Sequence, residues 1–516
     1  MIDGRKRTLM LALLGATTAG AIPLGGCTVG PDFKRPDWAS PASWFAGPKE
    51  AVKPPPSIPV AQPIDPNWWE LFKDPQLTKL ARRVAGENLD VKVAAIRFAE
   101  SRAQLGIAQA SQFPTLNGNA SYVRQKASNN GIFAIIPGAA GATGANGAQR
   151  NSTGGISGRD LQPFDLYQGG FDASWEVDLW GGVRRSVESA TASSEAATEA
   201  TRSVLLSSLA EVARDYIQLR GTQAELAIAR ENVDTARQSL NLTQQRAAGG
   251  VTTDLDVANA SAQLRTTLAQ IPSLEQREAE LINALSLLLG QPPNALREEL
   301  ATSKPVPPVP PRVPVGLPSE LARRRPDIRQ AEAQLHAATA DIGVAQANFY
   351  PSLSLTGSFG LQSLQWNRLF ELNARQWAIG PALTIPIFQG GQLRSTLELR
   401  KAQQQEAAVT FQKTVLQAWT EVDNALTAYK TEQTRRDQLI QAVAENRRAL
   451  GLAQSRYAQG VADFLTVLDT ERNLLATQQQ LAQSTATVSS NLVALYKALG
   501  GGWETDLPEE RKTASK

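Results

Sequence analysis

Two parts of the chain alternate strictly between apolar and polar side chains. From Phe171 to Leu179, the odd-numbered positions are apolar and the even-numbered ones are polar. A period of two predicts β-strands, and we expect hairpins over residues 115–180 and 352–388. Strands of about ten residues with one wholly apolar face are typical of a membrane β-barrel wall, which is apolar toward lipid. On this interpretation the acidic residues of the polar face point into a lumen: Asp172, Glu176 and Asp178.

Long helical stretches follow each predicted hairpin of strands. Residues 183–290 and 390–500 each read as a long helix, a turn at a Gly-Val pair and a shorter helix. At ~1.5 Å per residue, a first arm of about 70 residues would be roughly 105 Å long. Globular helices average only about 11–12 residues. Such an element is long enough to span something rather than to fold into a compact domain.

The whole arrangement occurs twice. Residues 84–116 align without gaps on residues 321–353, with 10 of 33 positions identical, and residues 246–257 align on 456–467, with 6 of 12 identical. We expect a first repeat over residues 76–303 and a second over 319–503, each built as helix, strand, loop, strand, long helix, turn and shorter helix. A Pro-rich linker, 304–318, joins them, and a tail, 504–516, ends the chain. The fold class is therefore a mixed α/β membrane protein.

Composition and charge exclude several functions. The net charge is only +3, which argues against nucleic acid as a partner. The single histidine, His336, and two methionines leave almost nothing for a transition-metal site, and no phosphate-binding loop is present. We therefore expect no cofactor, no metal and no enzyme activity.

The first 26 residues have the features of a secretory signal peptide. Three basic residues, 5–7, precede an apolar run, 9–22, that is too short to span a bilayer. The segment ends in Leu-Gly-Gly before Cys27, the only cysteine, which resembles a bacterial lipobox. We expect Cys27 to carry lipid, including palmitate, and to begin an extended arm, 27–75; the alternative is a stray cysteine beside an ordinary cleavage site. By resemblance to bacterial sorting rules, Thr28 after the lipobox directs the protein to the outer membrane.

Four strands cannot close a barrel alone, because bacterial barrels have eight or more. Open edges in lipid are costly, so copies of the chain must share one barrel: two copies give 8 strands and three give 12. The acidic face needs water, which favours the larger ring. The helices contain no run of about 20 apolar residues, so we place them in the periplasm. The sequence thus predicts a homotrimer with a 12-stranded barrel continuous with a long α-helical barrel.

Several motifs in order make the chain resemble the TolC-like outer-membrane factors, in particular OprM-type lipoprotein efflux channels. These motifs include Cys-Thr-Val-Gly-Pro-Asp-Phe from Cys27, Trp68-Trp69, Arg-Arg-Pro-Asp-Ile from Arg324 and Ile-Pro-Ile-Phe from Ile385. The resemblance implies a passive outer-membrane conduit for drugs and other small molecules. It also implies a tripartite pump with a periplasmic adaptor and an inner-membrane transporter of the RND type. Two alternatives are the exit duct of a type I protein secretion system and a soluble coiled-coil scaffold.

The resemblance also marks the folded ends of the hairpins as the periplasmic mouth. Leu465, Asp469 and Arg472 lie at i, i+4 and i+7 of one helix, and matching positions in the family line the constriction that closes the resting channel. The alternative is an ordinary solvated ion pair beside a core leucine. At the two turns, glycine followed by valine is expected both to end the helices and to dock the adaptor: Gly250, Val251, Gly460 and Val461.

Overall fold

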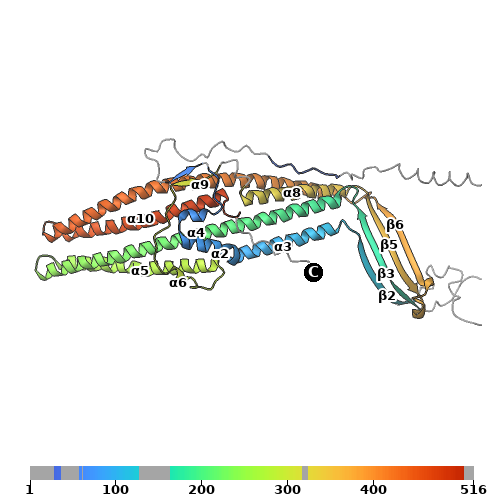
Figure 1. Ribbon diagram of the computed structural model, residues 1–516, viewed down its shortest axis with the longest axis horizontal. Coiled ribbons are helices and arrows are strands. Elements are labelled where there is room, and N and C mark those ends of the chain that lie inside the picture. The colour runs from blue at the N-terminus through green and yellow to red at the C-terminus, as the bar shows by residue number, and fades with distance from the viewer. Residues whose placement is uncertain (1–27, 37–56, 61, 127–162, 317–323, 505–516) are drawn as a thin grey trace, which may run out of the picture. The chain divides into compact units, whose positions relative to one another are not determined.

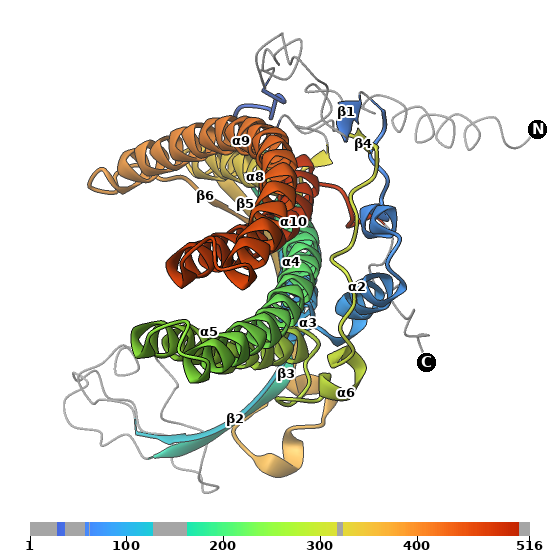
Figure 2. The same ribbon diagram turned by 90° about the vertical axis from the view of Figure 1, so that its left-hand side faces the viewer.

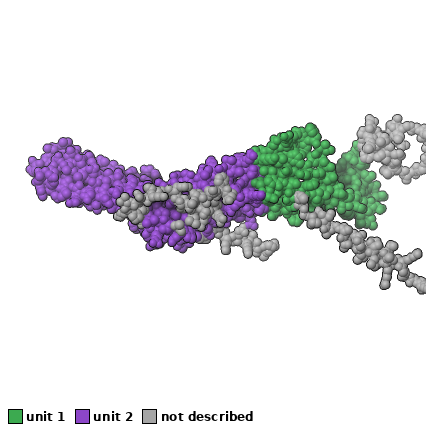
Figure 3. Space-filling view, turned by 90° about the horizontal axis from the view of Figure 1, so that it is seen from above, with its two compact units in different colours: residues 1–32, 105–189, 339–402 green, residues 33–104, 190–338, 403–516 purple. Residues whose placement is uncertain are grey.

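The computed structural model describes residues 28–36, 57–60, 62–126, 163–316 and 324–504. The predicted signal peptide, Cys27, residues 127–162 of the first predicted hairpin of strands and most of the tail lie outside the described residues. The chain divides into two compact units, coloured in Figure 3: residues 1–32, 105–189 and 339–402, and residues 33–104, 190–338 and 403–516. The boundaries between the units fall inside helices α3, α4, α8 and α9, whose ranges follow.

The first unit contains a four-stranded antiparallel sheet, labelled in Figure 1. Its strands are β2 (Thr115–Gln125), β3 (Phe164–Val177), β5 (Ser352–Ser363) and β6 (Arg375–Thr384), in the order β2-β3-β5-β6. Two short 3-10 helices, η3 (Trp366–Arg368) and η4 (Leu372–Ala374), connect β5 to β6. The strand pairs lie where the alternating pattern predicted them, except that β3 begins at Phe164, within a stretch that the Gly, Ala and Asn content predicted to be loop as far as Gly170.

The register confirms the two faces of the sheet. Phe171 lies opposite Gly118 on β2 and Phe359 on β5, and Phe359 in turn lies opposite Trp377 on β6. One position on, Asp172 lies opposite Asn117 and Ser358. Along the central part of the sheet, apolar and aromatic side chains therefore share one face and polar side chains share the other. The pattern breaks at one end, where Arg124 and Asp165 lie on the apolar face and Val123 and Leu166 on the polar one.

Two strands end earlier than the sequence pattern predicted. β3 ends at Val177, so Asp178 and Leu179 are not part of it, and β6 ends at Thr384 rather than Phe388. Asp178 instead binds the first turn of α4, since its carboxylate accepts hydrogen bonds from the main-chain N–H groups of Val183 at 3.2 Å and Arg184 at 2.9 Å. After Thr384, Pro386 lacks the N–H that a strand ladder needs.

Four long helices form two hairpins. α4 (Gly182–Ala248) and α9 (Gln392–Ala458) have 67 residues each, and α5 (Asp254–Leu288) and α10 (Phe464–Leu499) have 35 and 36. Figure 2 looks along them and shows α4 beside α5 and α9 beside α10. On α10, buried residues recur every three or four positions, as expected of one face of a helix.

The predicted single helix before β2 is wrong: the structure has η1 (Trp68–Phe72), α2 (Pro75–Glu87) and α3 (Leu89–Ala110). The break lies at Asn88, whose main chain is extended. Its side-chain oxygen accepts from the N–H of Val91 at 2.9 Å, and its side-chain N–H donates to the carbonyl of Leu288 at 2.8 Å. Asn88 thereby caps α3 and ties the break to the end of α5.

The linker contains a strand that sequence patterns missed. β4 (Arg312–Pro314) pairs in parallel with β1 (Ile58–Val60), and Val313, the central residue of β4, is fully buried. Nearby are α6 (Arg297–Leu300) and α8 (Pro326–Ala347). The core of the second unit includes Trp68, whose ring stacks on Tyr496 at 5.5 Å and whose indole N–H donates to the carbonyl of Gly501 at 3.0 Å.

Candidate functional site

The two hairpin turns have the same main-chain geometry. Gly250 and Gly460 both adopt positive φ, +70° and +77°. Each donates to the carbonyl three residues back at 2.9 Å, and each following valine donates to the carbonyl five residues back at 2.9 Å. This pattern is the Schellman motif, which glycine permits because it has no Cβ. Val251 and Val461 are 64% and 63% exposed, so both turns present an apolar side chain to solvent.

The stripe predicted to form the gate lies on the exposed face of α10. Leu465 is 54% exposed, and Asp469 and Arg472 are also exposed. Arg472 does not pair with Asp469 among the residues described; its Nε donates to Oε1 of Gln263 on α5 at 2.8 Å. A second contact along the same helices joins Gln479 to Gln270 at 2.7 Å. Arg472 thus connects the two hairpins of one chain.

A contact between the tips was not foreseen from the sequence. The Arg246 guanidinium, at the end of α4, lies 4.6 Å from the centre of the Tyr457 ring on α9. It donates to the main-chain carbonyls of Tyr457 at 2.8 Å and Ala458 at 3.1 Å. Tyr457 packs against Phe464 at 5.6 Å between ring centres, and the two side chains are 3% and 1% exposed. The one hint in the sequence was that the repeat alignment places an arginine at the same position before both turns, Arg246 and Arg456.

Two carboxyl groups near the stripe have shifted pKa values of opposite sign. Glu471 on α10 is buried, and this burial raises the pKa of its carboxyl although the Ser239 hydroxyl and Gln454 hydrogen bond to it. Asp463 precedes α10, and its carboxylate accepts from the hydroxyl of Thr466 at 2.7 Å and from its N–H at 3.1 Å. These bonds lower the pKa of Asp463.

The three acidic residues predicted to face a lumen fall into two groups. Asp172 and Glu176 lie on the polar face of β3, opposite Ser358 and Ser354 of β5. Asp172 also accepts a hydrogen bond from the Asn119 side chain of β2. Asp178 lies beyond the strand, and Arg184 Nε donates to its carboxylate at 3.1 Å in addition to the main-chain contacts. Its local partners make it the cap of α4.

The residues that follow Cys27 pack where β3 gives way to α4. The N–H of Val29 donates to the carbonyl of Trp180 at 3.0 Å, and Thr28 packs so closely on Gly181 that a Cβ there would meet it at 2.8 Å. Arg185, with a side chain 5% exposed, binds the carboxylate of Asp32 at 2.6 Å. The start of the arm is therefore fixed to the junction between β3 and α4.

Metal sites and membrane-spanning helices are not found in the described part of the chain. Within the described ranges, no three or more His, Cys, Asp and Glu side chains are grouped as a metal site would need. None of the helices that the structure describes combines the length and the apolar character needed to cross a bilayer.

The chain is similar to a group of known proteins over nearly its whole length. The model of a family described as outer membrane efflux protein matches residues 80–291 and 317–501. The chain is 33% identical over 505 residues to a probable efflux pump outer membrane protein, TtgC, of Pseudomonas putida, covering 96% of each. It is 34% identical over 441 residues to the pyoverdine export outer membrane protein OpmQ of Pseudomonas aeruginosa, covering 85% of this chain and 88% of that protein.

Solved structures of outer-membrane channels also match this chain. The outer-membrane channel OprN matches with a TM-score of 0.82 at 33% identity, covering 92% of this chain and 100% of that one. The open state of the MtrE outer membrane channel of Neisseria gonorrhoeae matches with a TM-score of 0.75 at 28% identity, covering 93% and 100%.

Proposed function

Because this chain belongs to the family of outer membrane efflux proteins, we propose that three copies of it assemble into a single channel, in which their sheets close one barrel and their helices continue it as a conduit. The protein is an efflux channel of the outer membrane with a helical periplasmic part, and its family consists of transporters rather than enzymes. We extend the proposal to the gate of the channel and to its partners.

The sheet carries the proposal of a trimer. Its two outer strands, β2 and β6, each have one edge without a partner among the described strands. One face of the sheet is apolar except at the end that carries Arg124, Asp165, Ser363 and Arg375. In lipid, unpaired main-chain groups cost several kcal/mol each, so an apolar sheet must close. If β6 of each copy pairs with β2 of the next, three sheets of four strands form a barrel of 12. Asp172 and Glu176 then face its water-filled lumen.

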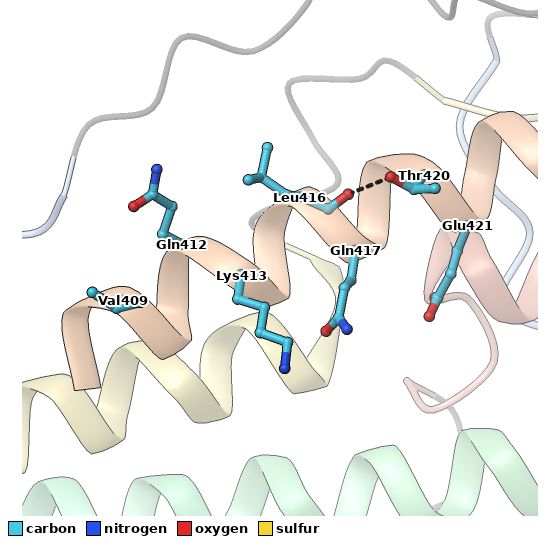
Figure 4. A pocket seen from close by; sticks show the side chains of 7 residues that line it. All are labelled: Val409, Gln412, Lys413, Leu416, Gln417, Thr420 and Glu421. Atoms are coloured by element: carbon cyan, nitrogen blue, oxygen red, sulfur yellow. Dashed lines mark hydrogen bonds between the residues drawn. The ribbon is translucent and has the colours of Figure 1, made fainter. Parts of the chain in front are cut away.

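The helices connected to these edge strands support the same arrangement. α3 leads into β2 and α9 follows β6, so the seam between copies continues along α3 and α9. Figure 4 shows a shallow hollow on α9, which includes Val409 at 65% and Leu416 at 48% exposure. On α3, Val93 and Ile96 are 45% and 60% exposed. These apolar side chains of one copy would cover those of the next.

The N-terminal arm supports a lipid anchor at Cys27. Thr28 and Val29 are fixed beside Gly181 and Trp180, at the end of β3. Acyl chains on the preceding residue would enter the same membrane that the strands span. Replacing Cys27 with Ser should abolish labelling by an alkynyl palmitate analogue, whereas retained labelling would place the lipid elsewhere.

We place the gate at Leu465, Asp469 and Arg472, because this exposed stripe of α10 would face two copies of itself across the trimer axis. Three apolar Leu465 side chains would exclude water. Three Asp469 carboxylates would repel one another unless cations such as Arg472 pair with them, and such pairs would hold the mouth closed. Arg472 acts through its bond to Gln263, which holds α10 to α5. Single-channel conductance in planar bilayers should therefore rise in Asp469→Ala with Arg472→Ala, and also in Gln263→Ala. Unchanged conductance in the double variant would remove these residues from the gate.

We assign the docking of a periplasmic adaptor to the two turns, since Val251 and Val461 are exposed at the ends of both hairpins. A bulky replacement, Gly460→Trp, should abolish cross-linking to the adaptor while trimers persist. Val461→Thr keeps the shape of the side chain and serves as the milder control. Normal cross-linking in Gly460→Trp would contradict docking at this turn.

The relatives support small molecules as cargo. Their names describe efflux of toluene, solvents and antibiotics and export of pyoverdine, which are small molecules rather than proteins. We therefore favour a tripartite efflux pump, with an inner-membrane transporter of the RND type, over a type I secretion duct. Deleting the gene for this chain should make the bacterium more susceptible to at least one such compound, while export of secreted proteins stays unchanged.

Native mass spectrometry of the protein in detergent tests the assembly directly. We expect trimers. A cysteine in β2 and one in β6, at Asn119 and Ala378, should form disulfides between copies, whereas a β2–β3 pair at Asn119 and Gly170 should react only within one chain. Monomers, or a different ring size, would overturn the proposed barrel.

A further inference from the structure

The contact between the two tips within one chain has two components. Arg246 donates to the carbonyls of Tyr457 and Ala458, which end α9, and its guanidinium rests on the Tyr457 ring. Carbonyls at a helix C-terminus lack intrahelical donors, so they accept from a cation readily. This joint holds the first hairpin tip to the second.

The repeat places the same arginine at the second tip. The offset of 210 residues that relates the two turns carries Arg246 onto Arg456. Arg456 is exposed, and its guanidinium has no hydrogen bond or ion pair among the residues that the structure describes. Arg246 binds the hairpin next to its own, which is the second hairpin of the same chain. By the same rule Arg456 would bind the hairpin on the other side of the second one, and that would be a first hairpin. In a closed ring of hairpins, that partner belongs to the next copy.

The first tip offers Arg456 a different surface from the one that Arg246 meets. The same offset of 210 carries Tyr457 back onto Ala247, Ala458 onto Ala248 and Phe464 onto Asp254. The aromatic pair is thus replaced by a methyl group and a carboxylate. Asp254 is exposed and has no partner among the described residues. Arg456 would therefore meet the methyl group of Ala247 where Arg246 meets the Tyr457 ring, with the Asp254 carboxylate at the position of Phe464.

We propose that Arg456 of each copy binds the first tip of the next copy, through an ion pair with its Asp254 and hydrogen bonds to the main-chain carbonyls of its Ala247 and Ala248. The proposal rests on the trimeric assembly proposed above. The mouth is then held by joints of two kinds: Arg246 on a buried aromatic pair within each chain, and Arg456 on an exposed carboxylate between chains. Salt screens only the exposed joint strongly. The mouth therefore parts first between chains.

Cross-linking tests the contact itself. Arg456→Cys combined with Asp254→Cys, in a Cys27→Ser background that is kept as trimers in detergent, should give covalent dimers and trimers on oxidation, seen on denaturing gels. The control pairs Arg456→Cys with Asp234→Cys, an exposed α4 position several turns from the tip, and should remain monomeric. Bands at the monomer position in both, from trimers shown to be intact, would overturn the contact. A wild-type protein without trimers would overturn the assembly instead, which separates the two failures.

A charge exchange tests its role. Arg456→Asp and Asp254→Arg should each raise conductance several-fold at low salt, and the two together should restore the wild-type value. The wild-type conductance, corrected for bulk conductivity, should also rise with salt. If the combined variant is as conductive as the single ones, the two residues do not face each other and the proposal is wrong.

Discussion

The α9–α10 hairpin is closed at its folded end by two buried rings, Tyr457 and Phe464, whereas the α4–α5 hairpin has Ala247 and Asp254 at the matching positions. The main-chain turns are the same in both. The second tip is therefore fixed by a buried pair of rings. The first tip has no such pair at the matching positions, and is held by its turn, by the hydrogen bond from the Thr252 hydroxyl to the Asp256 carboxylate and by the contact that Arg246 makes with the second tip. One repeat unit has become two different elements without a change of backbone.

The same contrast extends along the shorter helices. The offset of 210 residues carries Leu465, Asp469 and Arg472 onto positions of α5. These are Leu255, Asn259 and Ala262. The apolar member is kept, and both charges are absent. The charged ring that we assign to the gate thus belongs to the second hairpin alone, and a trimer would have three such stripes rather than six.

Removing the aromatic ring that closes the second tip should have the largest effect. Phe464→Ala deletes a side chain that is 1% exposed, and such changes cost about 3–5 kcal/mol. Because the tip lies at the end of long helices, the loss should appear as local opening. Hydrogen exchange of the peptide 456–470 should quicken by orders of magnitude, while the thermal transition of the whole protein changes little. Leu255→Ala, at an exposed position of the first tip, is the control. If hydrogen exchange at the mutated tip is equally slow in both variants, the buried rings do not make the second tip different from the first.

The sequence predicted the strands, the long helices and both turns. The strands and turns have local signatures, a period of two and Gly-Val after a helix, and α4, α9 and α10 are long runs without proline, whereas α5 continues through Pro272. It could not predict the partner of Arg472, since Gln263 is 209 residues away and an arginine accepts many partners. The β1–β4 pair was missed for a related reason. A three-residue strand beside prolines carries too few positions to show alternation, and only the burial of Val313 reveals it.

A smaller effect, of the opposite sign, is expected at Glu471, which is Ser261 at the matching position of α5. Burial raises the pKa of this carboxyl in the folded state, so the folded protein holds its proton more tightly than the unfolded one. Stability is therefore lost as pH rises from the ordinary glutamate pKa through the raised value. Glu471→Gln should protect the tip better than wild type near about pH 7 and equally well near about pH 4. If Glu471→Gln and the wild type exchange at equal rates at both pH values, the pKa of Glu471 is not raised by folding. Glu445→Gln, at an exposed site on α9, is the control.

The smallest effect separates the two helix starts that follow the turns. The Asp463 carboxylate caps α10 by accepting from Thr466, whereas Thr253, at the matching position, makes no such bond with its side chain. Asp463→Ala should therefore quicken exchange at the first turn of α10, and Thr253→Ala should leave α5 unchanged. The sign with pH is opposite to that of Glu471. The lowered pKa of Asp463 means that its contribution is present above the ordinary aspartate pKa and is lost as pH falls through the folded value. The difference between Asp463→Ala and wild type should therefore shrink in acid. If it stays constant down to about pH 2, the cap does not depend on the charge of the carboxylate, and the two tips differ in packing alone.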